Sequence, residues 1–132
     1  MRRALILGGN DLTDIENIRK LGEGWVGEEA LAIAVYSVAR HIDSFSDTII
    51  AAVNHDGDSD STGSIAGNIM GAIVGYENIP SNYKEHLELH NVILEIADDL
   101  HQGCIISEYA PIDTPEKIQW YERYCMMKPS GI

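Results

Sequence analysis

The middle of the chain reads Asn54-His55-Asp56-Gly57-Asp58-Ser59-Asp60-Ser61-Thr62-Gly63 and runs directly into the small-residue stretch 64–72. Carboxylates this close together repel one another unless a cation or a helix N-terminus stabilises them. A hard cation prefers oxygen ligands of this kind. Asp, Ser and Thr are also good N-caps, and acidic residues favour the first turn of a helix. Residue types alone therefore leave two explanations open, a metal site and a helix cap.

A calcium-binding EF-hand loop is the nearest generic motif, and it does not fit. Asp56, Asp58 and Asp60 match its first, third and fifth positions. Ser61 stands where the motif needs glycine, and Gly67 stands where it needs a bidentate glutamate. We therefore exclude this motif.

The segments around the acidic stretch predict helices. Apolar residues at helical spacing predict a helix over 28–41, and Ser44 with Asp47 resembles a capping box that opens the next helix. A third helix, over 60–73, has glycines at every fourth position, each costing about 1 kcal/mol relative to alanine. Such a cost predicts close packing of another helix, with Asn68 as a hydrogen-bonded core residue. Towards the C-terminus, helices are expected over 83–89 and 90–102 and from Pro115, with Thr114 as N-cap. We expect an all-α, compact multi-helix domain spanning 1–132.

A second informative stretch is Leu21-Gly22-Glu23-Gly24-Trp25-Val26-Gly27-Glu28-Glu29. Glycines let a backbone approach a ligand closely, and Trp25 has a face suited to a sugar or a base. The simpler interpretation is a turn between two helices with Trp25 as a core anchor, and glycine turns of this kind are common. On residue types alone, the turn is favoured.

Charge and composition exclude several classes of function. Lys and Arg number 9 and Asp and Glu number 21, so the net charge is 9 − 21 = −12. This charge argues against nucleic-acid and anionic-membrane partners. It also means that an anionic ligand needs help, for example from a bound cation. The 2 cysteines do not form a disulfide framework. The sequence has no signal-peptide core and no apolar run of membrane-spanning length, so a cytoplasmic location is the default. His86, His90 and His101 are interpreted as surface or capping histidines, since their spacing fits no metal motif.

Two stretches together resemble the ADP-ribosylglycohydrolase family, namely 22–32 and 56–67, and the tail 108–116 resembles that of some bacterial members. The resemblance runs from about residue 14 onward. It implies an all-α fold, two Mg²⁺ (or Mn²⁺) ions, and hydrolysis of the glycosidic bond at the ribose C1″ of ADP-ribosyl groups. Carried over position by position, it implies that Asp58, Asp60 and Ser61 are metal ligands, with Asp58 or Asp60 bridging the ions. It also implies that Gly57 and the loop Gly22, Glu23, Gly24 and Trp25 line the substrate cleft.

One departure from the family pattern limits what the resemblance implies. Members are about twice as long, and their N-terminal half supplies a Thr-Asp-Asp cluster and the acidic catalytic residue. Here Thr13-Asp14 is followed by Ile15, and no Thr-Asp-Asp occurs. The chain is thus expected to be a truncated or split C-terminal portion with no assignable catalytic residue.

The resemblance also implies partners. They are an ADP-ribosylated protein or small molecule as substrate, and a second copy or a complementing N-terminal fragment. The alternatives are a non-catalytic module that binds ADP-ribose and metal, and a purely structural helical oligomer.

Overall fold

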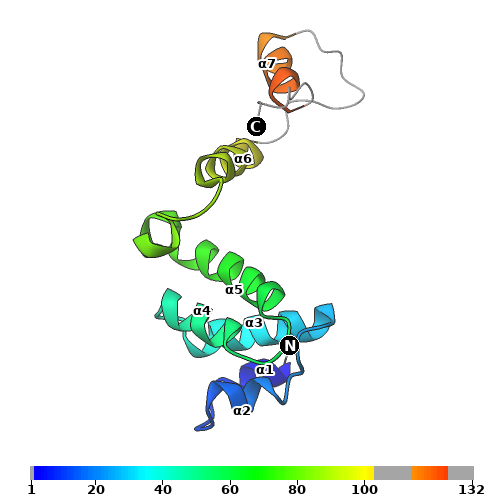
Figure 1. Ribbon diagram of the computed structural model, residues 1–132, viewed down its shortest axis with the longest axis vertical. Helices are drawn as coiled ribbons and strands as arrows, with labels where there is room; N and C mark the ends of the chain where they lie inside the picture. Colours follow the sequence, from blue (N-terminus) through cyan, green and yellow to red (C-terminus); the bar gives the residue numbers. More distant parts are fainter. Residues whose placement is uncertain (1, 103–113, 125–132) are drawn as a thin grey trace. The chain divides into compact units, whose positions relative to one another are not determined.

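The computed structural model describes residues 2–102 and 114–124 of the chain, and within them every regular element is helical (Figure 1). The predicted all-α fold class is therefore confirmed. Contacts divide the chain into two units, Met1–His86 and Leu87–Ile132. The expectation of one domain over 1–132 stays a prediction. In the part of the chain that the structure describes, no helix is long and apolar enough to cross a membrane.

The first unit contains five α-helices and two short 3₁₀ helices. They are α1 (Arg2–Leu7), α2 (Asp14–Ile18), α3 (Gly27–Arg40), α4 (Phe45–Val53), α5 (Ser59–Val74), η1 (Tyr76–Asn78) and η2 (Ser81–Tyr83). The sequence predicted α3 and α5 to within one residue at each end. The predicted capping side chain of Ser44 accepts a hydrogen bond from the Asp47 amide at 3.2 Å.

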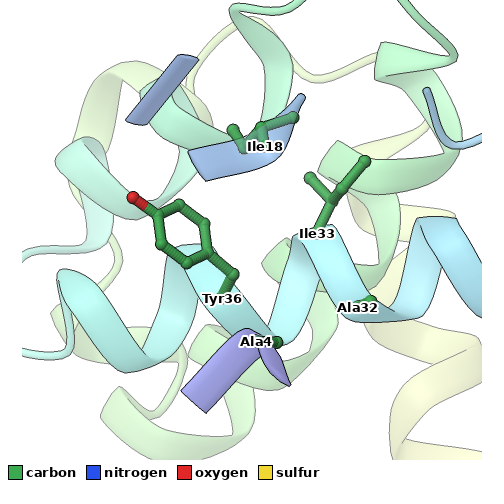
Figure 2. Close-up of a cluster of buried hydrophobic side chains, with 5 residues drawn as sticks. All are labelled: Ala4, Ile18, Ala32, Ile33 and Tyr36. Atoms are coloured by element: carbon green, nitrogen blue, oxygen red, sulfur yellow. The ribbon is translucent and has the colours of Figure 1, made fainter. Parts of the chain in front are cut away.

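Helix α3 lies at the centre of the first unit because it is buried on two sides. One cluster of buried side chains joins it to α1 and α2, and Figure 2 shows these residues converging: Ala4, Ile18, Ala32, Ile33 and Tyr36. A second cluster joins it to α4 and α5: Ala34, Val38, Ala52, Ala66 and Met70. Alanine supplies two of the five residues of the first cluster and three of the five of the second, which lets the helices pack closely.

The glycines of α5 provide the predicted close packing. A Cβ built on Gly63 would lie 2.6 Å from Val53 Cγ1, and one on Gly67 would lie 3.7 Å from Ile49 Cδ1. Helix α4 therefore packs directly on this side of α5. The prediction for Asn68 is wrong. Its side chain is exposed and donates to the Ser64 carbonyl of the same helix at 2.8 Å, because that side of α5 faces away from α4.

A partly buried polar network fixes α2 against α3. Thr13 caps α2 through a full capping box with Glu16, as the sequence allowed. The Tyr36 hydroxyl donates to Asp14 Oδ1 at 2.6 Å and accepts from Asn17 Nδ2 at 3.1 Å. Burial, together with the hydrogen bond to Asp14, raises the pKa of Tyr36 to about 12. The guanidinium of Arg40 also reaches Asp14, at 3.2 Å.

The second unit contains α6 (His90–Gln102) and α7 (Pro115–Tyr124). Thr114 caps α7 as predicted, accepting from the Lys117 amide at 3.3 Å. Arg123 of α7 forms ion pairs with Glu95 and Asp99 of α6. No α-helix covers 83–89, contrary to prediction, because η2 ends at Tyr83 and Leu89 adopts a left-handed φ of 58° just before α6. Gly103, a residue type that commonly ends a helix, lies outside the described residues.

Candidate functional site

Two loops of the first unit meet through their backbones. The Asp58 amide donates to the Glu23 carbonyl at 2.8 Å. A Cβ built on Gly57 would overlap that same carbonyl, so this approach requires glycine at position 57. The loop before α3 and the acidic loop before α5 therefore form one continuous surface.

The loop before α3 is held by the first turn of that helix. Glu29 Oε2 accepts from the amides of Glu23 and Gly24, at 3.1 Å each. Gly22 has a φ of 131°, and a side chain there would collide with Glu29. Gly24 has a φ of 84°, and a Cβ on it would lie 3.1 Å from Thr62 Cγ2. Both glycines are needed for a conformation that presses the loop against α3 and α5.

A cavity of about 570 Å³ opens beside the junction of the two loops. Its walls come from α2, the loop before α3 and the acidic loop: Ile15, Ile18, Arg19, Gly22, Glu23, Trp25, Val26, Glu29, His55, Asp56 and Gly57. Four of the five residues predicted to bind substrate line it, namely Gly22, Glu23, Trp25 and Gly57. Gly24 is absent from the wall but shapes the loop.

Trp25 does not anchor the core. Its side chain is 67% exposed, and its indole Nε1 donates to Glu23 Oε2 at 3.1 Å. The glycines do form a turn before α3, as the turn interpretation predicts. Its prediction of a buried Trp25 is wrong, because Trp25 lines the cavity instead. An indole held by one hydrogen bond at its edge leaves a face free for stacking.

The three predicted metal ligands open α5 next to this cavity. Asp58 is the N-cap, but its carboxylate makes no capping hydrogen bond. Asp60 is exposed in the first turn and accepts from the Ser61 amide at 2.9 Å. A hydrogen bond from the Asp58 carboxyl, and then the Ser61 amide, lower the pKa of Asp60 below its usual value. The capping explanation therefore does not account for the Asp58 side chain.

The predicted metal ligands do not form a complete metal site within the described residues. Across 2–102 and 114–124, no three His, Cys, Asp or Glu side chains gather as a metal site. Asp58, Asp60 and Ser61 offer only hard oxygen donors, and they lie outside the cavity wall. Their assignment as ligands stays a prediction. His86 and His101 are exposed, in agreement with their interpretation as surface histidines.

Sequence reasoning missed His55, which connects the acidic loop to α5. Its Nδ1 accepts from the Gly57 amide at 3.1 Å, and its Nε2 lies 3.0 Å from Thr62 Oγ1. The Thr62 hydroxyl donates to the Ala52 carbonyl at 2.7 Å. Side chains of Asn, Asp, Ser and Thr commonly make such local bonds to the backbone, but a histidine gives no comparable signal in the sequence.

Arg19 was also missed, because it lies on no recognisable motif. It is the one arginine or lysine among the described residues of the cavity wall. Its guanidinium lies 3.4 Å from Asp56 Oδ2, and both side chains are largely exposed. An exposed pair of this kind contributes little stability and leaves Arg19 free to change partners.

Comparisons with known proteins agree with the two motifs. The ADP-ribosylglycohydrolase family model matches residues 2–108, a longer match than the predicted start near residue 14. Most of the tail 108–116 lies beyond the match and outside the described residues. No solved structure matches the chain significantly.

Curated relatives are similar over part of their own length. ADP-ribosylarginine hydrolase Tri1 of Serratia proteamaculans (strain 568) is 30% identical over 98 residues, which cover 74% of this chain and 26% of that protein. ADP-ribosylhydrolase ARH3 of Bos taurus is 25% identical over 107 residues, covering 74% of this chain and 29% of that protein. The chain thus spans less than a third of these relatives. Because the family model covers most of its length, including both loops of the cavity, the chain belongs to the ADP-ribosylglycohydrolase family.

Proposed function

We propose that this chain provides the ADP-ribose cavity and part of the divalent-metal site of an enzyme that hydrolyses the glycosidic bond at the ribose C1″ of ADP-ribosyl groups. The observation that carries the proposal is the junction of Gly57 with Glu23. This junction brings the loop that resembles the family's substrate loop against the loop that resembles its metal motif. Family membership supports the reaction class.

Magnesium or manganese fits the donor atoms of the acidic loop. Asp58, Asp60 and Ser61 present carboxylate and hydroxyl oxygens, which both ions accept. The Asp58 carboxylate is not engaged in capping α5. When bound, the ions would grip the ribose hydroxyls and polarise the attacking water. Two ions need more ligands than this loop offers, so we infer that further ligands come from elsewhere.

The cavity suits an ADP-ribosyl group if the repulsion between the acidic wall and the negatively charged diphosphate is offset. Glu23, Glu29 and Asp56 make the wall acidic, while a diphosphate carries negative charge. Glu29 is already engaged by two backbone amides, and Glu23 by the Trp25 indole. Arg19 can leave Asp56 for a phosphate oxygen, since guanidinium pairs well with phosphate. Trp25 would then stack on the base or a ribose.

We propose that bond cleavage needs residues that this sequence does not contain. The sequence contains no Thr-Asp-Asp cluster and offers no acidic residue that we assign as catalytic. Leu5 and Ile6 of α1 are 58% and 65% exposed, and such apolar side chains suit a covering partner. A second copy of the chain would cover these side chains, but only a segment that carries the family's N-terminal half would also supply the missing cluster. The missing cluster equally favours a second candidate function, a module that binds ADP-ribose and metal without turnover.

A turnover assay tests whether the chain cleaves the bond by itself. Purified chain is incubated with an ADP-ribosylated arginine peptide in Mg²⁺ or in EDTA, and free ADP-ribose is quantified by chromatography. We expect no release by the chain alone, together with Mg²⁺-dependent binding of ADP-ribose. Mg²⁺-dependent release would show that no residues beyond this sequence are needed, and equal release in EDTA would overturn the role of the metal.

A further inference from the structure

We propose that His55 is a positioning residue: its imidazole fixes the acidic loop, and through that loop the substrate loop, in the geometry that binds ligand. The binding part of this inference rests on the function proposed above. The geometric part does not, because it concerns hydrogen bonds within the chain itself.

The imidazole uses both of its nitrogens. Nδ1 accepts from the Gly57 amide at 3.1 Å, so Nδ1 carries no proton. Nε2 lies 3.0 Å from Thr62 Oγ1, and that hydroxyl already has three carbonyl acceptors within reach, those of Ala52 at 2.7 Å, Asp58 at 3.1 Å and Ser59 at 3.2 Å. Nε2 must then be the donor. Both contacts assign the same neutral tautomer, with the proton on Nε2.

One end of this bridge is anchored in the core. Thr62 and Ala52 are both 0% exposed, and Ala52 belongs to the buried cluster that joins α3, α4 and α5. Hydrogen bonds to such groups hold because breaking them leaves buried polar atoms unsatisfied. Nε2 is thus attached to a rigid part of the fold.

The other end controls the orientation of one peptide group. Nδ1 holds the Gly57 amide, and the next amide, that of Asp58, donates to the Glu23 carbonyl at 2.8 Å. Turning the Gly57 backbone would move the Asp58 side chain, a predicted metal ligand, and would break the contact with Glu23. One imidazole therefore positions a residue in each loop.

The acidic loop needs such a restraint because its negatively charged side chains repel one another in the folded conformation. Asp56, Asp58 and Asp60 crowd the turn, and Arg19 pairs only with Asp56. His55 also lines the cavity. Removing its side chain would therefore widen the cavity and also release the acidic loop.

The test compares three variants of the full chain with wild type: His55→Ala, His55→Asn, and the exposed histidine His86→Ala as matched control. Amide hydrogen exchange is measured by NMR at Gly57 and Asp58 and at core positions Ala52 and Ala66. Mg²⁺ affinity is measured by calorimetry, and long-range ¹H–¹⁵N spectra report the tautomer.

We expect the Nε2–H tautomer in wild type. In His55→Ala, exchange at Gly57 and Asp58 should rise at least about tenfold and Mg²⁺ affinity should fall about 10- to 100-fold, with core exchange unchanged. His55→Asn should restore much of the protection at Gly57, since an Asn side chain also accepts from the amide two residues on. His86→Ala should match wild type.

Four results would overturn the inference. They are unchanged loop exchange in His55→Ala, core exchange that rises together with the loop, a proton found on Nδ1, and His55→Asn exchanging as fast as His55→Ala. Failure of the wild-type chain to bind Mg²⁺ would refute the proposed metal site instead. Amide hydrogen exchange at Gly57 would still decide whether His55 is a positioning residue.

Discussion

Gly57 lies against the carbonyl of Glu23 so closely that no side chain fits between them, and the next amide donates to that carbonyl at 2.8 Å. Two segments more than thirty positions apart in sequence are thereby joined without any side-chain contact. A substitution that moves one loop must therefore also move the other.

Gly57→Ala should separate the loops. The new Cβ would meet backbone atoms, which cannot move as the end of a side chain can, so we expect a loss of about 1–3 kcal/mol in the free energy of unfolding. Urea denaturation measures it. The matched control is Gly27→Ala at the start of α3, where a Cβ has open space and alanine should be neutral or stabilise by up to about 1 kcal/mol. Equal effects of the two changes would contradict the close approach.

Thr62→Val should lower the free energy of unfolding, although valine has nearly the same shape as threonine. It removes the hydroxyl that serves both Ala52 and His55 in a fully buried position. An unsatisfied buried carbonyl costs about 1–3 kcal/mol, whereas Thr62→Ser keeps the hydroxyl and loses only a methyl group. If Thr62→Val were as stable as wild type by chemical denaturation, the hydroxyl network would not hold the loop.

Asp58→Ala and Asp60→Ala should each abolish binding of Mg²⁺ or Mn²⁺, because each removes a carboxylate from a loop that offers few ligands. Calorimetric titration of the ion measures this. Asp43→Ala is the control, as Asp43 is exposed and belongs to neither loop. Unchanged affinity in both loop variants would remove the basis for the metal assignment.

Tyr36 should make stability fall at high pH. Its pKa is about 12 in the folded chain, above the ordinary tyrosine value of 10.0, so the folded state holds this proton more tightly. The contribution is fully present below pH 10 and is lost as pH rises towards 12, amounting to up to about 3 kcal/mol at about 1.4 kcal/mol per pKa unit. Thermal unfolding of wild type and Tyr36→Phe between pH 8 and pH 12 measures the difference, with Tyr121→Phe, in the second unit, as control. Parallel curves for wild type and Tyr36→Phe would contradict it.

Much of the fold was predictable from local pattern. The spacing of apolar residues in α3, the capping residues Ser44 and Thr114, and the glycines of α5 each act through neighbours in sequence or one adjacent helix. Asn68 was misjudged because position on a helix does not tell which side another helix covers.

The sequence predicted the motifs of the site, but not how tertiary packing brings them together. Gly22, Glu23, Trp25 and Gly57 were identified from motif resemblance, and they do line one cavity. Arg19 was missed because it reaches the cavity only through tertiary packing of α2 on α3. The orientation of Trp25 depends on Glu29 holding the loop amides, a contact that no periodicity reports.

The most direct test of the central claim is calorimetric titration of ADP-ribose into the purified chain, with and without Mg²⁺. The account predicts binding that is stronger in Mg²⁺ and loses this dependence in Asp58→Ala. Absence of binding under both conditions, in a chain that folds cooperatively, would contradict the claim that these two loops form an ADP-ribose site.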